Sequence, residues 1–234
     1  MTPPTADDRT VGRRAPWIEP ADLRVGILGG TFDPVHYGHL VIAEEVRESL
    51  SLDRVLFIPA AVPPHKLGLE ITPPEDRAAM VELAIAGNPA FAMSRVELDR
   101  SGPSYTVDTL ETLANEARRE GIIRRLFFIL SSEAAAALPS WRAPARILEL
   151  ARLVVVPRSG FPVPDVGVLA SDAGASPGDE RILAAETVPL AHSSSDVRSR
   201  AASGRSIRYL VPPAVEAYIR DHRLYLSDNP RRTA

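Results

Sequence analysis

Residues 23–39 read LRVGILGGTFDPVHYGH, and this stretch carries the strongest indication of the fold. The apolar run LRVGIL is typical of a buried strand, and Gly29 and Gly30 end it. A helix is predicted over residues 36–50, because apolar side chains recur there at helical spacing, at Leu40, Ala43, Val46 and Leu50. A strand, a glycine-rich loop and a helix in this order open a βαβ unit.

The alternation of strand and helix continues along the chain. Further strands are expected at RVLFIP (54–59), FAMSRVEL (91–98), RLFFIL (125–130) and RLVVVP (152–157), with two short helices between the last two. One helix is expected to begin near Pro74 and end at Gly87, and another to be capped by Ser104 and end at Gly121. Such alternation requires right-handed crossovers, so we predict an α/β fold with an open, doubly wound parallel sheet.

The chain is expected to divide into an α/β core and two kinds of appendage. Residues 1–22 are rich in proline and charge and predict a flexible extension, and residues 229–234 a tail. The core would occupy residues 23–190. Within it, a surface insertion is expected at 159–180 and one further strand in ILAAETVPL (182–190). A small C-terminal helical part would follow at 191–228, with helices at about 195–203 and 212–223.

Composition excludes several classes of protein. The chain has 234 residues, 45% of them apolar, which is enough to build a sizeable core. A net charge of -3 argues against a broad electrostatic grip on nucleic acid, and the lack of cysteine excludes disulfides, thiol catalysis and thiolate metal sites. With no apolar run long enough for a membrane span, we expect a cytoplasmic protein without a membrane or nucleic-acid partner. Of the 27 basic residues, Lys66 alone is lysine.

The loop after the first strand is the predicted ligand site. Ligands of open parallel sheets lie beyond the carboxyl ends of the strands, and glycines followed by a helix N-terminus suit a phosphate. Neither G-x-G-x-x-G nor G-x-x-x-x-G-K-[ST] is present, which counts against a dinucleotide-dependent dehydrogenase and a P-loop NTPase. His36 and His39 share one helix face and are candidate donors to phosphate oxygens. A metal pair and two merely structural histidines are the alternatives.

Two segments carry a family resemblance. GGTFDPVHYGH resembles the G-x-F-x-P-x-H-x-G-H signature of the nucleotidylyltransferase superfamily, and residues 193–198, SSSDVR, resemble its second hallmark, Ser-Ser-[ST]-x-[IV]-Arg. Further segments are similar to nicotinate-nucleotide adenylyltransferases: PPHK (63–66), SYTVDTL (104–110), Trp141, Arg158 and RYLVP (208–212). The resemblance covers roughly residues 23–226.

The resemblance implies adenylyl transfer from ATP to nicotinate mononucleotide, giving deamido-NAD and pyrophosphate in NAD biosynthesis. His36, His39 and Arg198 would be catalytic. ATP would be bound by these three and by Gly29, Gly30, Thr31, Phe32, Glu133, Ser194 and Ser195. Nicotinate mononucleotide would be bound by Tyr105, Thr106, Trp141 and Arg158. We add two residues on other grounds: Arg142, where many relatives have an aromatic residue, as a positive charge for the nicotinate carboxylate, and the lone lysine, Lys66, as a phosphate contact. Mg²⁺ would be held mainly through the ATP phosphates. No metal-binding residues are expected in the chain, and whether copies form a homo-oligomer is left open.

Several of these residues have plainer interpretations. Trp141 could be a core or lid residue, Thr106 a first-turn residue, Ser195 the N-cap of its helix and Arg158 a solvated arginine. The chain also departs from the family pattern. Residues 131–133, Ser-Ser-Glu, replace the usual Gly-x-Asp, and His192 stands where an aliphatic residue is usual. Alternatives are therefore an enzyme preferring nicotinamide mononucleotide or phosphopantetheine, and a non-catalytic nucleotide-binding protein.

Overall fold

The structure is a computed structural model that describes residues 22–63, 70–176, 181–187 and 192–226. Its sheet has six parallel strands in the order β3-β2-β1-β4-β5-β6. This is the strand order of a doubly wound nucleotide-binding sheet, which confirms the predicted fold class. The strands are β1 (Asp22–Gly30), β2 (Arg54–Pro59), β3 (Phe91–Met93), β4 (Ile123–Ser131), β5 (Ala151–Val156) and β6 (Ile182–Ala184).

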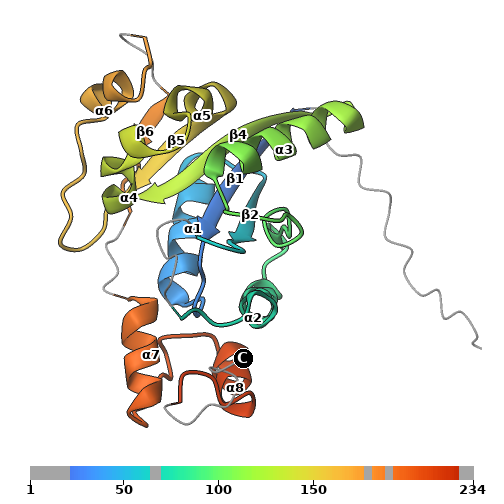
Figure 1. The fold of residues 1–234 in the computed structure, drawn as a ribbon, viewed down its shortest axis with the longest axis vertical. Coiled ribbons are helices and arrows are strands. Elements are labelled where there is room, and N and C mark those ends of the chain that lie inside the picture. The colour runs from blue at the N-terminus through green and yellow to red at the C-terminus, as the bar shows by residue number, and fades with distance from the viewer. Residues whose placement is uncertain (1–21, 64–69, 177–180, 188–191, 227–234) are drawn as a thin grey trace, which may run out of the picture.

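Eight α-helices and a 3-10 turn are found in the described part of the chain (Figure 1). They are α1 (Tyr37–Ser49), α2 (Pro74–Ile85), α3 (Thr106–Glu120), α4 (Ser132–Ala136), the 3-10 turn Leu138–Ser140, α5 (Pro144–Leu150), α6 (Val166–Asp172), α7 (Ser194–Ala202) and α8 (Pro213–Asp221). Figure 1 shows α7 and α8 together, at one end of the molecule and away from α5 and α6.

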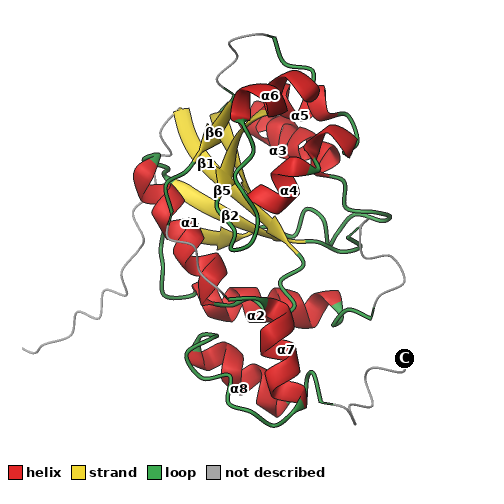
Figure 2. Ribbon diagram, turned by 90° about the vertical axis from the view of Figure 1, so that its left-hand side faces the viewer, coloured by secondary structure: helices red, strands yellow, loops and turns green. Residues whose placement is uncertain are grey.

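Each face of the sheet has its own apolar core, because successive strand residues point to opposite sides. On one face, Phe127 and Ile129 of β4 pack with residues of α1, α2, α7 and α8. On the other face, Leu126, Phe128 and Leu130 pack with residues of α3, α4, α5 and α6. Figure 2 shows α1 on one side of the strands and α3 and α5 on the other. The C-terminal helices thus share a core with the helix that follows the glycine loop.

Most predicted elements are present, and the differences have local causes. The strand expected over 91–98 is only three residues long, since the chain turns away after Met93. Ser104 does not cap α3, because its Oγ accepts a hydrogen bond from the Ala61 backbone N–H (3.1 Å) and Tyr105 is the N-cap. The insertion expected at 159–180 contains α6, whose Leu169 and Ala170 are buried in the second core.

The predicted terminal parts can be compared with the structure only in places. Residues 1–21, which make up nearly all of the predicted extension, and the predicted tail lie outside the described residues. The strand predicted after the insertion is confirmed as β6, and the two C-terminal helices are confirmed as α7 and α8. The division into separate parts at residues 22, 190 and 228 stays a prediction.

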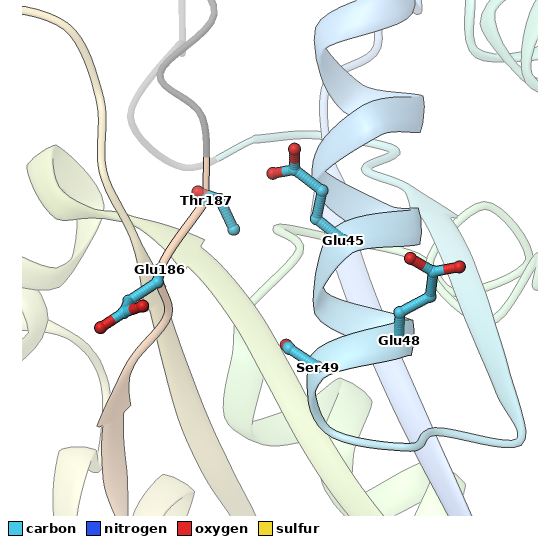
Figure 3. A pocket seen from close by; sticks show the side chains of 5 residues that line it. All are labelled: Glu45, Glu48, Ser49, Glu186 and Thr187. Carbon is cyan, nitrogen blue, oxygen red and sulfur yellow. The ribbon is translucent and has the colours of Figure 1, made fainter.

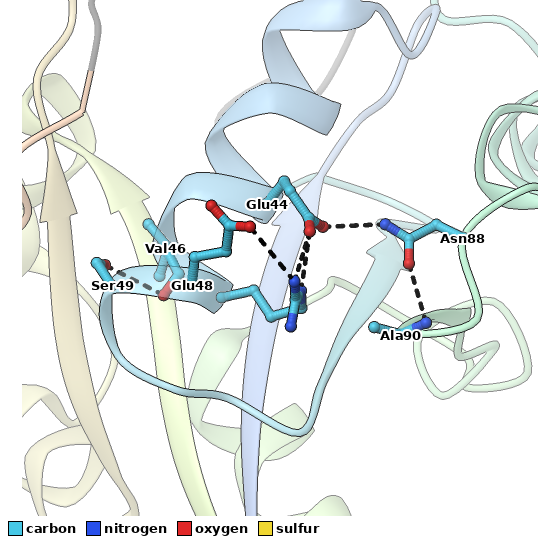
Figure 4. Close-up of polar contacts among 7 residues, drawn as sticks. Glu44, Val46, Glu48, Ser49, Asn88 and Ala90 are labelled. Carbon is cyan, nitrogen blue, oxygen red and sulfur yellow. Dashed lines mark hydrogen bonds and ion pairs between the residues drawn. The ribbon is translucent and has the colours of Figure 1, made fainter.

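Polar contacts at Glu44 hold the middle of helix α1 (Figure 4). Asn88, in the turn between α2 and β3, donates from Nδ2 to the Glu44 carboxylate (2.9 Å) and accepts from the Ala90 backbone N–H (2.9 Å). Arg47 forms an ion pair with the same carboxylate (2.6 Å). These bonds lie beyond the first turn of α1 and hold the helix that carries His39.

A substitution at Gly121 tests the assignment of this residue as the end of α3. Gly121 ends α3 at φ +71°, in the left-handed region, and a side-chain carbon added there would meet no other atom within 4 Å. Gly121→Ala should therefore lower the free energy of unfolding by about 1 kcal/mol through backbone strain alone. Gly87→Ala is the control, because Gly87 is equally uncrowded and has no positive φ. Urea denaturation measures both, and an equal effect of the two substitutions would contradict the assignment.

Candidate active site

The predicted site lies where the crossover direction of the sheet changes. β1 pairs with β2 on one side and β4 on the other, so the carboxyl ends of β1 and β4 lie side by side, at Gly30 and Ser131. This switch point is where open α/β sheets bind ligands. A side-chain carbon at Gly30 would lie 3.1 Å from the Phe32 ring, so the close turn leaves little room for a larger residue.

Phe32 anchors the loop rather than facing a ligand with its side chain. Its backbone is left-handed (φ +50°), its side chain is 1% exposed, and its ring packs near Phe57 at 5.9 Å between centroids. The edge of the same ring contacts His39 at 5.0 Å. Residues 29–32 are predicted to line the ligand site. Within this group, the Phe32 ring supports His39, and its backbone is the part left to face a ligand.

His36 and His39 are brought together as predicted. His36 is the N-cap of α1, and the two imidazole rings stack at 3.8 Å between centroids. The backbone N–H of His36 donates to Nδ1 of His39 (3.2 Å). Neutral His39 must then carry its proton on Nε2, so its free ring nitrogen is a hydrogen-bond donor.

Burial favours the neutral form of both imidazoles. Burial lowers the pKa of His36 to about 4, with smaller contributions from the nearby His192 and Arg158. Burial, followed by His36 and Arg158, also lowers the pKa of His39 well below 6.5. An uncharged imidazole still donates a hydrogen bond through its N–H. A bound polyphosphate would bring negative charge, which the positive charge of Arg158 favours.

His192, which departs from the family pattern, completes a row of three rings. Its ring lies 6.4 Å from that of His36, at 29° between planes. Gly38 permits this approach, since a side-chain carbon there would lie 2.9 Å from the His36 ring and 3.3 Å from His192 Cβ. The Nδ1 atoms of His36 and His192 are both buried without a partner among the described residues.

Residues of α7 clamp the opposite side of the loop. Ser194 Oγ donates to the Pro34 carbonyl (2.9 Å), and Arg198 donates to the Asp33 carbonyl (2.7 Å). The interpretation of Ser195 as the N-cap is wrong, because Ser193 fills that position by accepting from the Asp196 N–H (3.1 Å). Ser195 Oγ instead accepts from the Arg198 guanidinium (3.2 Å).

Two residues that support the loop were not singled out in the sequence. Arg77 is 1% exposed, and its guanidinium donates to the carbonyls of Thr31 (2.7 Å), Thr72 (2.8 Å) and Ala61 (3.3 Å). Tyr225 donates to the Asp33 carboxylate (2.8 Å). A signal for Arg77 was available, since it lies on α2 close to the apolar Met80 and Val81, which are buried with it.

Three of the predicted mononucleotide-binding residues, Tyr105, Thr106 and Arg142, lie together at the start of α3. Thr106 is the first residue of that helix, and Tyr105 is its N-cap. The Arg142 guanidinium lies 5.0 Å from the centre of the Tyr105 ring and contacts Asp108 at 3.4 Å. Trp141 packs edge-on against Phe128, with 6.2 Å between ring centroids. Lys66 lies outside the described residues.

Glu133 and Arg158, predicted to serve different substrates, form an ion pair with each other. Both side chains are about half exposed. The pair brings the end of β4 together with the turn after β5, so the site spans the carboxyl ends of β1, β4 and β5.

A separate cavity of about 690 Å³ lies along the side of α1 (Figure 3). It is lined by Glu45, Glu48, Ser49, Glu186 and Thr187. Three carboxylates would repel a polyphosphate, so this cavity is not the nucleotide site.

The described residues contain no group of three or more His, Cys, Asp and Glu side chains that could hold a metal ion. Nor does any helix among them have the length and apolarity needed to cross a bilayer.

Comparison with known proteins places this geometry in a family. The cytidylyltransferase-like family model matches residues 27–200. A protein from Roseiflexus sp. (strain RS-1), named probable nicotinate-nucleotide adenylyltransferase, is 52% identical over 86% of this chain and 97% of its own length. The chain belongs to the nicotinate-nucleotide adenylyltransferase family. A family member of the same name from Thermus thermophilus is 44% identical over 87% of this chain and 100% of its own length.

Solved structures agree on the fold of this adenylyltransferase. Plasmodium falciparum nicotinic acid mononucleotide adenylyltransferase complexed with NaAD has a TM-score of 0.67 at 18% identity, covering 87% of this chain and 97% of that one. A nicotinate-nucleotide adenylyltransferase structure from Vibrio parahaemolyticus has a TM-score of 0.62 at 15% identity, over 88% and 98% of the two chains.

The buried His36 predicts an acid-sensitive stability. The unfolded chain takes up a proton at this position near pH 6.5, whereas the folded adenylyltransferase resists it down to about pH 4. Stability should thus fall as pH decreases through this window, by about 2 kcal/mol between pH 7 and pH 5 for this residue. In His36→Asn, urea denaturation should show a pH 7 to pH 5 loss smaller by that amount. An unchanged loss would show that burial does not suppress protonation of His36.

Proposed function

We propose that this chain transfers the adenylyl group of ATP to nicotinate mononucleotide, giving nicotinate adenine dinucleotide and pyrophosphate. The observation that carries the proposal is the arrangement of His36, His39 and Arg198 around one loop at the switch point of the sheet. Its support includes the printed names of relatives that are 42% to 52% identical. It is further supported by two Plasmodium falciparum structures of the same fold, one complexed with NaAD and one with APC.

The reaction needs alignment and charge stabilisation more than acid–base chemistry. The nucleophile is the phosphate of the mononucleotide, which is mostly a dianion at neutral pH because its second pKa is about 6. One of its oxygens bonds to the α-phosphorus of ATP, and the bond from that phosphorus to the bridging oxygen of the β-phosphate breaks. Pyrophosphate leaves with the electron pair, so no covalent enzyme intermediate is required.

On the ATP side, the backbone of residues 29–32 would approach the nucleotide. Neutral His39 would donate from Nε2 to a phosphate oxygen, and His36 would donate beside it. The guanidinium of Arg198 has five N–H groups and uses part of them on Asp33 and Ser195, leaving others for the triphosphate. Ser194 and Ser195 would close on the same oxygens.

On the mononucleotide side, Trp141 would stack on the pyridine ring and Thr106 would lie beside it. Tyr105 lies against one face of the Arg142 guanidinium and Asp108 contacts one of its nitrogens, which leaves the remaining N–H groups for an anion. Arg158 and Lys66 would meet the phosphate of the mononucleotide.

Magnesium fits this donor set through ATP. Imidazole and hydroxyl groups are poor ligands for Mg²⁺, which prefers phosphate oxygens and water. We therefore infer that the ion arrives on the ATP phosphates, whose charge it neutralises when bound, and that the chain's own residues hold the phosphates rather than the ion.

An assay of purified protein tests the proposal. With ATP and magnesium, pyrophosphate should be released when nicotinate mononucleotide is the acceptor. Release only with nicotinamide mononucleotide or with phosphopantetheine would replace the proposed acceptor, and no release with any acceptor would favour a non-catalytic nucleotide-binding protein.

His39→Asn tests the donor role directly. Asparagine keeps an acceptor for the His36 N–H but removes Nε2–H, so kcat should fall about 10²- to 10³-fold, the usual loss for one transition-state donor. His222→Asn is the control, since His222 follows α8 and stacks on Tyr218. Full turnover in His39→Asn would remove His39 from the mechanism.

Arg142→Ala tests acceptor preference. If the Arg142 charge meets the nicotinate carboxylate, the ratio of kcat/KM for nicotinate over nicotinamide mononucleotide should fall about tenfold or more, as expected for one charge-assisted hydrogen bond. Arg146→Ala is the matched control, because it removes another half-exposed arginine that is already paired with carboxylates. An unchanged ratio in Arg142→Ala would show that Arg142 does not interact with the nicotinate carboxylate.

A further inference from the structure

Ser132, the middle residue of the segment Ser131-Ser132-Glu133, has a structural role at the turn after β5. Ser132 is 1% exposed, and its Oγ donates to the Phe161 carbonyl (3.1 Å) while accepting from the Arg158 backbone N–H (3.2 Å). The turn closes on itself through a hydrogen bond from the Phe161 N–H to the Arg158 carbonyl (3.0 Å). Ser132 thus fixes the backbone from which the Arg158 side chain projects.

The Arg158 side chain is paired with Glu133, which is exposed to solvent. Its guanidinium forms an ion pair with Glu133, the residue next to Ser132, and the Phe161 ring centre lies 5.7 Å from the guanidinium carbon. The two charged side chains are 50% and 45% exposed. An exposed pair of this kind contributes little stability, so a stronger anion can displace the carboxylate.

Arg158 also lies within electrostatic range of the phosphate site. Its charge is among the causes that lower the pKa of both His36 and His39. A phosphate dianion accepts two parallel hydrogen bonds from one guanidinium, as a carboxylate does, but carries more negative charge, so it is the better partner.

We propose that the Glu133 carboxylate pairs with the Arg158 guanidinium in place of the substrate's phosphate. The pair separates when the phosphate of the mononucleotide binds to Arg158. The inference rests on the proposed function, because it takes the mononucleotide as the incoming anion. Ser132 keeps the turn in place, so that only side chains exchange partners. Glu133 is then a competitor that weakens mononucleotide binding, which sets it apart from a residue that contacts ATP.

A double-mutant cycle tests the exchange. Steady-state rates with ATP, magnesium and nicotinate mononucleotide are compared for the wild type, Glu133→Gln, Arg158→Gln and the double variant. Glu133→Gln should lower KM for the mononucleotide about two- to fivefold, the range that an exposed ion pair can supply. In the Arg158→Gln background the same substitution should have no effect on KM.

Each other outcome overturns the proposal. A KM for the mononucleotide that stays the same or rises in Glu133→Gln removes the competition. An effect that persists without Arg158, or that appears in KM for ATP, shows that Glu133 acts elsewhere. Glu149→Gln is the matched control, since it removes a carboxylate from an exposed pair with Arg146 on α5, and it should leave KM unchanged.

Binding without turnover separates this inference from the proposed function. Titration calorimetry with nicotinate mononucleotide alone should show binding to Glu133→Gln that is about two- to fivefold tighter than to the wild type. If the wild type turns over the mononucleotide but the two affinities are equal, the exchange fails and the proposed function stands. If the wild type neither binds nor turns over the mononucleotide, both fail.

Discussion

Hydrogen bonds to the carbonyl oxygens of the signature loop are the constraint on which this site depends. Four carbonyls within five residues accept bonds from three different parts of the chain: Gly30 from the Ala60 N–H, Thr31 from Arg77, and Asp33 and Pro34 from Arg198 and Ser194 of α7. A loop that binds phosphate must turn its partial negative charges away from the ligand. The donors do this, and three of them have a second function: Arg77 joins three loops, whereas Arg198 and Ser194 bring α7 to the site.

The same constraint explains why a buried arginine is retained under the loop. Burial lowers the pKa of Arg77, and the Asp33 carboxylate opposes that shift. Asp33 in turn accepts from Tyr225, whose pKa burial raises well above 10. An apolar residue at position 77 would leave three carbonyls without this donor, which is costlier than the loss of one hydrogen bond suggests.

Local patterns in the sequence were sufficient for the sheet and for the paired histidines, because hydrophobic period and the glycine loop depend on neighbours in the chain. They failed where a distant or competing partner decides the local structure. Ser104 looked like a helix cap but bonds to Ala61, and Ser195 lost that role to Ser193. The ion pair of Glu133 with Arg158 could not be predicted either, since it forms only when β4 and β5 lie side by side.

The contact between Asp33 and Tyr225 spans 192 residues of sequence, and that between Asp33 and Arg198 spans 165. During synthesis on the ribosome, β1, β2, β3 and β4 can assemble while these partners are still untranslated, because domains form from the N-terminus as the chain emerges. The signature loop would then lack three of its donors, Ser194, Arg198 and Tyr225. The loop therefore reaches its final geometry only after α7 and Tyr225 have folded onto it.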